Sequence, residues 1–168
     1  ILDFDKAVVT KVIQTMVADG VRHSVSINLS LDSVFDIGFK NWLKNIVSQN
    51  SAIASQLVFS VTAYGVAKDV EKFKYFIQAI HSVGAKIIIK RFETRFIPLD
   101  NVKDFNLDYI RLARDYTEGI KKESTKQGFV ESMQELCQLL NIKLFAENVK
   151  DDDDFSYVEK LNLYGASR

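Results

Sequence analysis

Polar residues lie at or just beyond the carboxyl ends of the apolar segments that we predict to be strands. They are Asn28, Ser60 with Thr62, Lys90 with Arg91, Arg111 and Glu147. In a chain of alternating strands and helices, the carboxyl ends of parallel strands meet on one side, where chemistry usually sits. Guanidinium and ammonium groups gathered in a concave site suit phosphate oxygens, which arginine can meet through two hydrogen bonds. We therefore predict a site for a phosphate-bearing ligand.

A plainer interpretation of the same residues stays open. Charged residues at strand ends are most often exposed or paired with an opposite charge. Under this interpretation Lys90 and Arg91 are solvent-exposed residues of a loop, and Arg111 forms an ion pair with Glu147.

Apolar spacing predicts the elements that position these residues. Strands are expected over residues 24–29, 57–62, 86–90, 109–112 and 143–146. Apolar residues repeated at three and four positions predict helices from about Asp5 to Met16, around 39–47, over 70–80 with a stop at Gly84, over 129–140, and from Asp151–Asp154 through Leu161. The continuous apolar run at 86–90 is typical of a parallel sheet covered by helices on both faces.

Composition excludes several classes of protein. The 22 basic and 22 acidic residues cancel, so no overall field favours nucleic acid or an anionic membrane. No run approaches 18 apolar residues and no signal peptide opens the sequence, so we expect no membrane insertion by this chain and a cytoplasmic location.

The cysteine and the histidines do not indicate a reactive or metal site. The one cysteine, Cys137, lies on an apolar helix face, so we expect a buried thiol. His23 and His81 lack zinc-site spacing.

Six segments share a resemblance to one family. Residues 26–30 resemble the asparagine motif of the EAL family, cyclic di-GMP phosphodiesterases built as modified strand–helix barrels. Residues 57–62 resemble the strand that normally carries a metal-binding glutamate, and residues 90–93 fall where the family has Asp-Asp-Phe-Gly. Residues 107–113 fall on its lysine-isoleucine-aspartate motif, residues 145–150 on its alanine-glutamate-glycine-valine-glutamate motif, and Ser167 on a terminal glutamine.

The resemblance implies an α/β fold, a TIM-like (β/α) barrel of the EAL type, here truncated at both ends. Residues 1–168 would form a single degenerate EAL domain that lacks the namesake first strand and the last strand. Exposed strand edges favour completion by another chain or a swapped element, so a homodimer is expected.

The resemblance also implies that the metal site is lost. Asn28 and Glu147 keep the family's residue types, and Arg111 replaces a lysine. Carboxylates are missing at Ser60, Lys90, Arg91, Ala113 and Lys150. Hard divalent cations need clustered oxygen ligands, and the new positive charges repel them. We therefore expect no metal, no catalytic residue and no phosphodiesterase activity.

Within the family, residues 91–96, 107–110 and 123–126 look most like the degenerate output domain of LapD-type receptors, which bind cyclic di-GMP without cleaving it. The resemblance implies ligand contacts by Asn28, Lys90, Arg91, Phe92, Arg111 and Glu147. The cations would meet the two phosphates, Phe92 would pack beside a guanine, and Asn28 with Glu147 would orient it.

Such a receptor would be the cytoplasmic module of an inner-membrane protein that couples to a periplasmic protease. The alternative is a degenerate EAL scaffold of the CsrD type, which acts through protein–protein contacts without nucleotide. The replacements at Ser60 and Ser167 suit that alternative.

Overall fold

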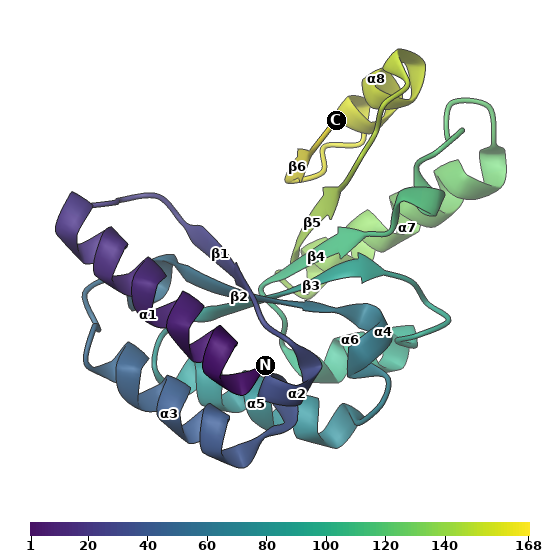
Figure 1. The fold of residues 1–168 in the computed structure, drawn as a ribbon. Coiled ribbons are helices and arrows are strands. Elements are labelled where there is room, and N and C mark those ends of the chain that lie inside the picture. The colour runs from purple at the N-terminus through teal and green to yellow at the C-terminus, as the bar shows by residue number, and fades with distance from the viewer. The chain divides into compact units, whose positions relative to one another are not determined.

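Strands and helices alternate from one end of the chain to the other in a computed structural model that describes residues 1–168 (Figure 1). The packing of the α-carbons divides the chain into two compact units, unit 1 (residues 1–61 and 65–88) and unit 2 (residues 62–64 and 89–168). The elements are α1 Leu2–Asp19, β1 Val25–Asn28, α2 Leu31–Phe35, α3 Ile37–Ser48, η1 Ala54–Gln56, β2 Leu57–Thr62, α4 Ala63–Val66, α5 Val70–Ser82, β3 Lys86–Phe92, α6 Leu99–Phe105, β4 Tyr109–Leu112, η2 Arg114–Tyr116, α7 Ser124–Leu139, β5 Lys143–Ala146, α8 Asp152–Lys160 and β6 Gly165–Ala166. None of these helices combines the length and the hydropathy that crossing a bilayer requires.

The strands follow the chain order β1-β2-β3-β4-β5-β6. Pairing is parallel between β1 and β2, between β4 and β5, and between β5 and β6. Because a parallel strand pair needs a crossover, each connection carries helical residues. The predicted fold class, parallel strands alternating with helices as in a TIM-like fold, is confirmed.

Unit 1 packs its helices against β1 and β2. Figure 1 shows α1, α3 and α5 side by side along these strands. The buried side chains repeat at the spacing of one helix face, as with Phe39, Leu43 and Val47 on α3. The β2 strand is buried along nearly its whole length, as expected for a parallel strand covered on both faces.

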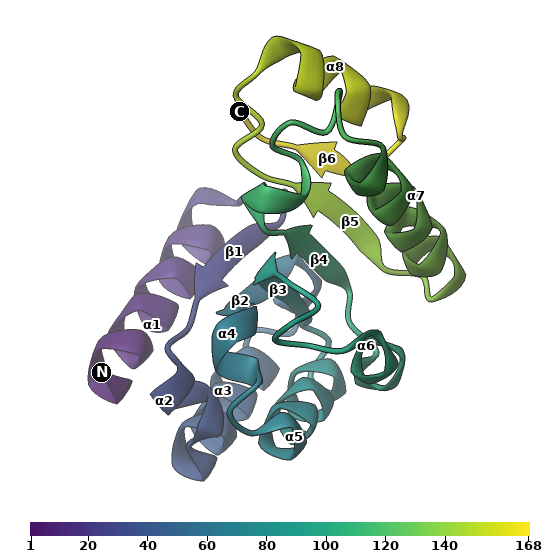
Figure 2. The same cartoon turned by 90° about the vertical axis from the view of Figure 1, so that its right-hand side faces the viewer.

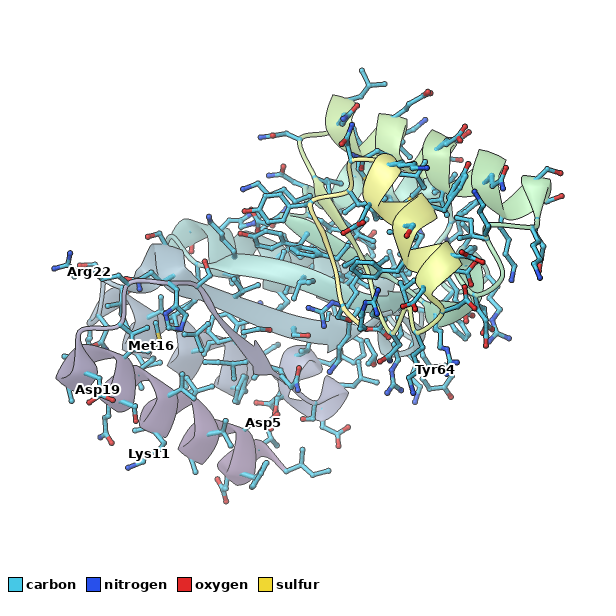
Figure 3. All side chains as sticks on the ribbon, turned by 90° about the horizontal axis from the view of Figure 1, so that it is seen from above. Asp5, Lys11, Met16, Asp19, Arg22 and Tyr64 are labelled. Atoms are coloured by element: carbon cyan, nitrogen blue, oxygen red, sulfur yellow. The ribbon has the colours of Figure 1, made fainter.

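A buried carboxylate ties α1 to the turn that follows β1. Asp5 Oδ2 accepts hydrogen bonds from the Ser30 backbone N (2.9 Å), the Ser30 hydroxyl (2.7 Å) and the Ser33 hydroxyl (2.6 Å). Ser30 is also the N-cap of α2. Figure 3 shows Asp5 at the α2 end of α1 and Asp19 at the opposite end. Since Ser30 is only two residues beyond Asn28, Asp5 fixes the path of the chain just after β1.

Unit 2 contains the pairs β4–β5 and β5–β6, with α7 alongside β5 and α8 alongside β6 (Figure 2). Three aromatic rings, Tyr109, Phe145 and Tyr164, have their centroids 5.1–6.4 Å apart. Cys137 is buried on α7, which confirms the predicted buried thiol, and this burial raises the pKa of the thiol to about 12.

Most predicted elements are confirmed, and the differences have local causes. The strands predicted at 57–62, 109–112 and 143–146 have these bounds in the structure. The first helix begins three residues before the predicted start, because the Asp5 N–H donates to the Ile1 carbonyl and closes an earlier turn. Asp151 caps the predicted last helix, since its carboxylate accepts from the Asp153 and Asp154 N–H groups.

Asp5→Ala is expected to lower the free energy of unfolding by about 2–3 kcal/mol, because three donors lose their charged acceptor. Burial alone would raise the pKa of Asp5, but the hydrogen bonds from Ser33 and Ser30 outweigh it and hold the pKa below its ordinary value. The stabilisation is therefore present at neutral pH and is lost as the pH falls through that lowered pKa. Urea unfolding at neutral and acidic pH measures both effects. Asp3→Ala, an exposed change in the same helical turn, is the control, and an equal loss in both variants would refute this role.

Candidate functional site

The carboxyl end of β3 places three consecutive predicted residues in different environments. Lys90 is half-buried, Arg91 is exposed and Phe92 is completely buried. The Phe92 carbonyl accepts a 3.0 Å hydrogen bond from the Ala113 N–H, which fixes the end of β3 beside the end of β4. Arg91 has φ 52°, a left-handed conformation that disfavours a side chain with a Cβ atom. Such a conformation on a cationic residue at a strand end is typical of functional positions.

Arg111 and Glu147 come from the two neighbouring strands. The parallel register sets Arg111 of β4 opposite Phe145 of β5, and Glu147 follows two residues later on the same strand path. The Arg111 Nη1 atom lies 4.0 Å from Glu147 Oε2, with 39% and 16% of the two side chains exposed. The Arg111 guanidinium also lies 5.9 Å from the centre of the Phe145 ring. The ion pair proposed in the plainer interpretation therefore exists, at the limit of its distance range.

Arg91, Arg111 and Glu147 all act electrostatically on Lys90, and we call these four residues the strand-end cluster. The pKa of Lys90 is lowered, first by partial burial and then by the charges of Arg91 and Arg111. The Glu147 carboxylate acts in the opposite direction. One carboxylate thus faces three cations, and the folded chain carries an excess of positive charge at this point. An anion would relieve that repulsion.

The turn after Glu147 is held by a residue whose role the sequence did not indicate. Asn148 is left-handed, with φ 54°, and its N–H donates a 3.1 Å hydrogen bond to the Ser167 hydroxyl. The Val149 N–H donates to the Ser167 carbonyl (2.9 Å). Asparagine tolerates this conformation better than most residues with a side chain, so an asparagine two residues beyond the end of β5 was the sequence signal for the turn.

Asn28 lies in unit 1, at the carboxyl end of β1. The register sets Asn28 opposite Ser60 of β2, and the Leu29 N–H donates a 2.9 Å hydrogen bond to the Ser60 carbonyl. Of the six predicted ligand contacts, the structure therefore brings four together in the strand-end cluster. Phe92 lies in the core and Asn28 in the other unit. The ligand roles of all six remain predictions.

No three or more histidine, cysteine, aspartate or glutamate residues gather closely enough to hold a metal ion. In the strand-end cluster, Glu147 is the one carboxylate among three cationic neighbours.

The EAL domain family model matches residues 1–166. The probable cyclic di-GMP phosphodiesterase PdeN of Escherichia coli is 26% identical over 134 residues, which are 80% of this chain and 26% of PdeN. The RNase E specificity factor CsrD of the same organism is 15% identical over 145 residues, 86% of this chain and 22% of CsrD. The chain thus spans about a quarter of the length of these relatives.

Among solved structures, the S helix-GGDEF-EAL portion of Vibrio cholerae LapD bound to c-di-GMP superposes with a TM-score of 0.86. The match has 19% sequence identity and covers 96% of this chain and 40% of the LapD chain. The apo form of the same LapD portion gives the same TM-score. This likeness establishes the shared fold.

Two substitutions should shift the pKa of Lys90 in opposite directions. Glu147→Gln removes the negative charge that favours the ammonium form, so the pKa of Lys90 should fall further. Arg111→Gln removes a positive charge, so the pKa should rise. An NMR titration of the labelled lysine side chains measures both. Arg95→Gln is the control, because the Arg95 guanidinium pairs with Glu93 and is not among the charges that lower the pKa of Lys90. Shifts of the same sign in the first two variants would contradict the cluster.

Proposed function

Because the chain belongs to the EAL domain family, we propose that it is a cyclic di-GMP receptor module that binds the dinucleotide without hydrolysing it. Its strand-end cluster supplies the phosphate contacts in this proposal. The excess of three cations over one carboxylate is the observation that carries it. Cyclic di-GMP presents two phosphates, and fixed guanidinium groups bind phosphate oxygens with directed, charge-assisted hydrogen bonds.

The electrostatics of Lys90 support an anionic ligand. Partial burial and two like charges work against its ammonium form in the free protein. A phosphate beside Lys90 would add a negative charge and would raise the pKa of Lys90 again. Glu147 already lies near Arg111, so the carboxylate would hold that guanidinium in position and accept hydrogen bonds from a guanine edge.

The donor set does not fit a divalent metal, which supports binding without hydrolysis. Magnesium and related hard cations require several oxygen ligands, usually carboxylates. The strand-end cluster offers Glu147 alone, and the cations that lower the pKa of Lys90 would also repel a metal ion.

The two remaining predicted contacts, Phe92 and Asn28, have different roles in the proposal. Phe92 has no exposed surface, so we assign it to holding the end of β3, and its packing beside a guanine stays a prediction. Asn28 is a proposed ligand contact on unit 1, and its position is fixed only with respect to its neighbours in that unit.

We extend the proposal to the parent protein through the likeness to LapD. The chain would be the cytoplasmic output domain of an inner-membrane protein, and ligand would favour one of two arrangements of that protein. Coupling to a periplasmic protease and a homodimeric state belong to the same proposal. Light scattering over a range of concentrations measures the oligomeric state directly.

Isothermal calorimetry with cyclic di-GMP, first with magnesium and then with chelator, tests the function. Saturable binding that is unaffected by chelator, with no linear dinucleotide on chromatography, is the expected result. Arg91→Glu should weaken binding by about 100-fold or more, because it replaces an attractive charge near the phosphates with a repulsive one. Lys122→Glu makes the same charge change at an exposed position of unit 2 and should bind as the parent sequence does.

The other outcomes decide against the proposal. A linear product that disappears with chelator would establish a phosphodiesterase. An absence of heat at high ligand concentration would favour the scaffold alternative, for which the similarity to CsrD is the available support. Equal losses in Arg91→Glu and Lys122→Glu would show a general charge effect rather than a contact.

A further inference from the structure

A groove outside the strand-end cluster runs along the helical surface of unit 1. It consists of two adjoining hollows of about 240 and 300 Å³ that share the side chains of Lys40 and Tyr75. We call it the lysine-rimmed groove and define it by Phe35, Ile37, Lys40, Lys44, Lys72 and Tyr75. These residues come from the end of α2, from α3 and from α5, three helices that contact one another.

The groove exposes large apolar side chains that the core does not use. Ile37 is 67% exposed and Tyr75 is 57% exposed, although both lie beside the buried Val34 in the same hollow. Ala79 forms part of the second hollow and is almost fully buried. Exposed apolar residues that line a hollow and are bordered by polar ones mark interaction sites more often than scattered exposed residues do.

The rim of the groove is positively charged. Lys40, Lys44 and Lys72 line it, and none of the three takes part in an ion pair. The one acidic lining residue is Asp36, whose carboxylate caps α3 by accepting a 2.7 Å hydrogen bond from the Phe39 N–H. That charge is already engaged by the helix N-terminus. The groove therefore presents apolar surface within a ring of uncompensated positive charge.

The position of Lys40 connects the two properties. Its ammonium group lies 5.9 Å from the centre of the Tyr75 ring, within the range of a cation–π contact. An anionic side chain bound at Lys40 would thus lie directly beside the ring that an apolar side chain would cover. Tyrosine is also among the residue types that contribute most to binding energy at protein interfaces.

From this geometry we propose that the lysine-rimmed groove binds an acidic segment of a partner protein, with an aromatic or aliphatic side chain of that segment inserted beside Tyr75. The concave shape favours a peptide over a bilayer, because a membrane surface is flat and contacts projecting residues. The charge complementarity would steer the encounter, and the inserted side chain would supply most of the affinity. The proposal does not depend on nucleotide binding.

The test is fluorescence anisotropy of the whole chain with a fluorescein-labelled synthetic peptide in which a phenylalanine and a leucine are flanked by glutamates. We expect saturable binding that weakens as salt is raised. Tyr75→Ala should weaken it by about 10-fold, and Lys40→Glu with Lys72→Glu by about 10-fold or more. Lys11→Glu is the matched control, because Lys11 lies on α1, where Figure 3 shows its side chain directed away from the sheet.

Amide chemical shifts recorded with the same peptide show where it binds, and the expected perturbations fall on residues 35–44 and 72–79. No measurable binding, or binding that Lys11→Glu reduces as much as the groove variants do, would overturn the proposal. So would perturbations centred outside the groove. Two further results would replace the proposed occupant: binding to phosphatidylserine vesicles but not to the peptide, or a concentration-dependent dimer that Tyr75→Ala abolishes, which would indicate a second copy of the chain.

Discussion

Parallel pairing of the strands is the constraint on which the candidate site depends. A parallel register brings the carboxyl ends of neighbouring strands to the same edge. The β4–β5 register sets Arg111 opposite Phe145, two residues before Glu147, and the Arg111 and Glu147 side chains approach to 4.0 Å across the strands. A slip of one residue would turn Arg111 to the other face of the sheet. The buried aliphatic residues of β4 and β5 oppose such a slip, because the slip would expose them.

The charges at these strand ends disfavour the ammonium form of Lys90, and the proposed anionic ligand would offset them. Burial and like charges both disfavour the ammonium form of Lys90. A left-handed Arg91 adds backbone strain at the next position. Proteins keep such arrangements at sites where a ligand relieves them. The lysine-rimmed groove differs in kind, since its cations border apolar surface and its affinity would come from an inserted side chain rather than from phosphate contacts.

The sequence predicted the fold better than the site, for identifiable physical reasons. Continuous apolar strands and long amphipathic helices carry a strong periodic signal, so β2, β4 and β5 were located exactly as the structure has them. The helices α2, α4 and α6 are too short to show a period and were not predicted. In the candidate site, residue type and strand position predicted that Lys90, Arg91, Arg111 and Glu147 lie near one another, which the structure shows, whereas their ligand roles remain predictions. The burial of Phe92 and the bond from Asn148 to Ser167 depend on tertiary packing that no local pattern encodes.

Several separate residues distinguish this strand-end cluster from a metal site, and no single change would reverse them. An aspartate at position 90 would add one oxygen donor between Arg91 and Arg111, which would pair with it before any metal did. A hard divalent cation would still find few ligands, because Ala113 carries no carboxylate and position 150 is a lysine. Each further carboxylate would pair with the same cations before it could bind a metal ion. Under the proposed function, an anionic ligand would meet the charges of Arg91 and Arg111 beside Lys90 without any such change of residues.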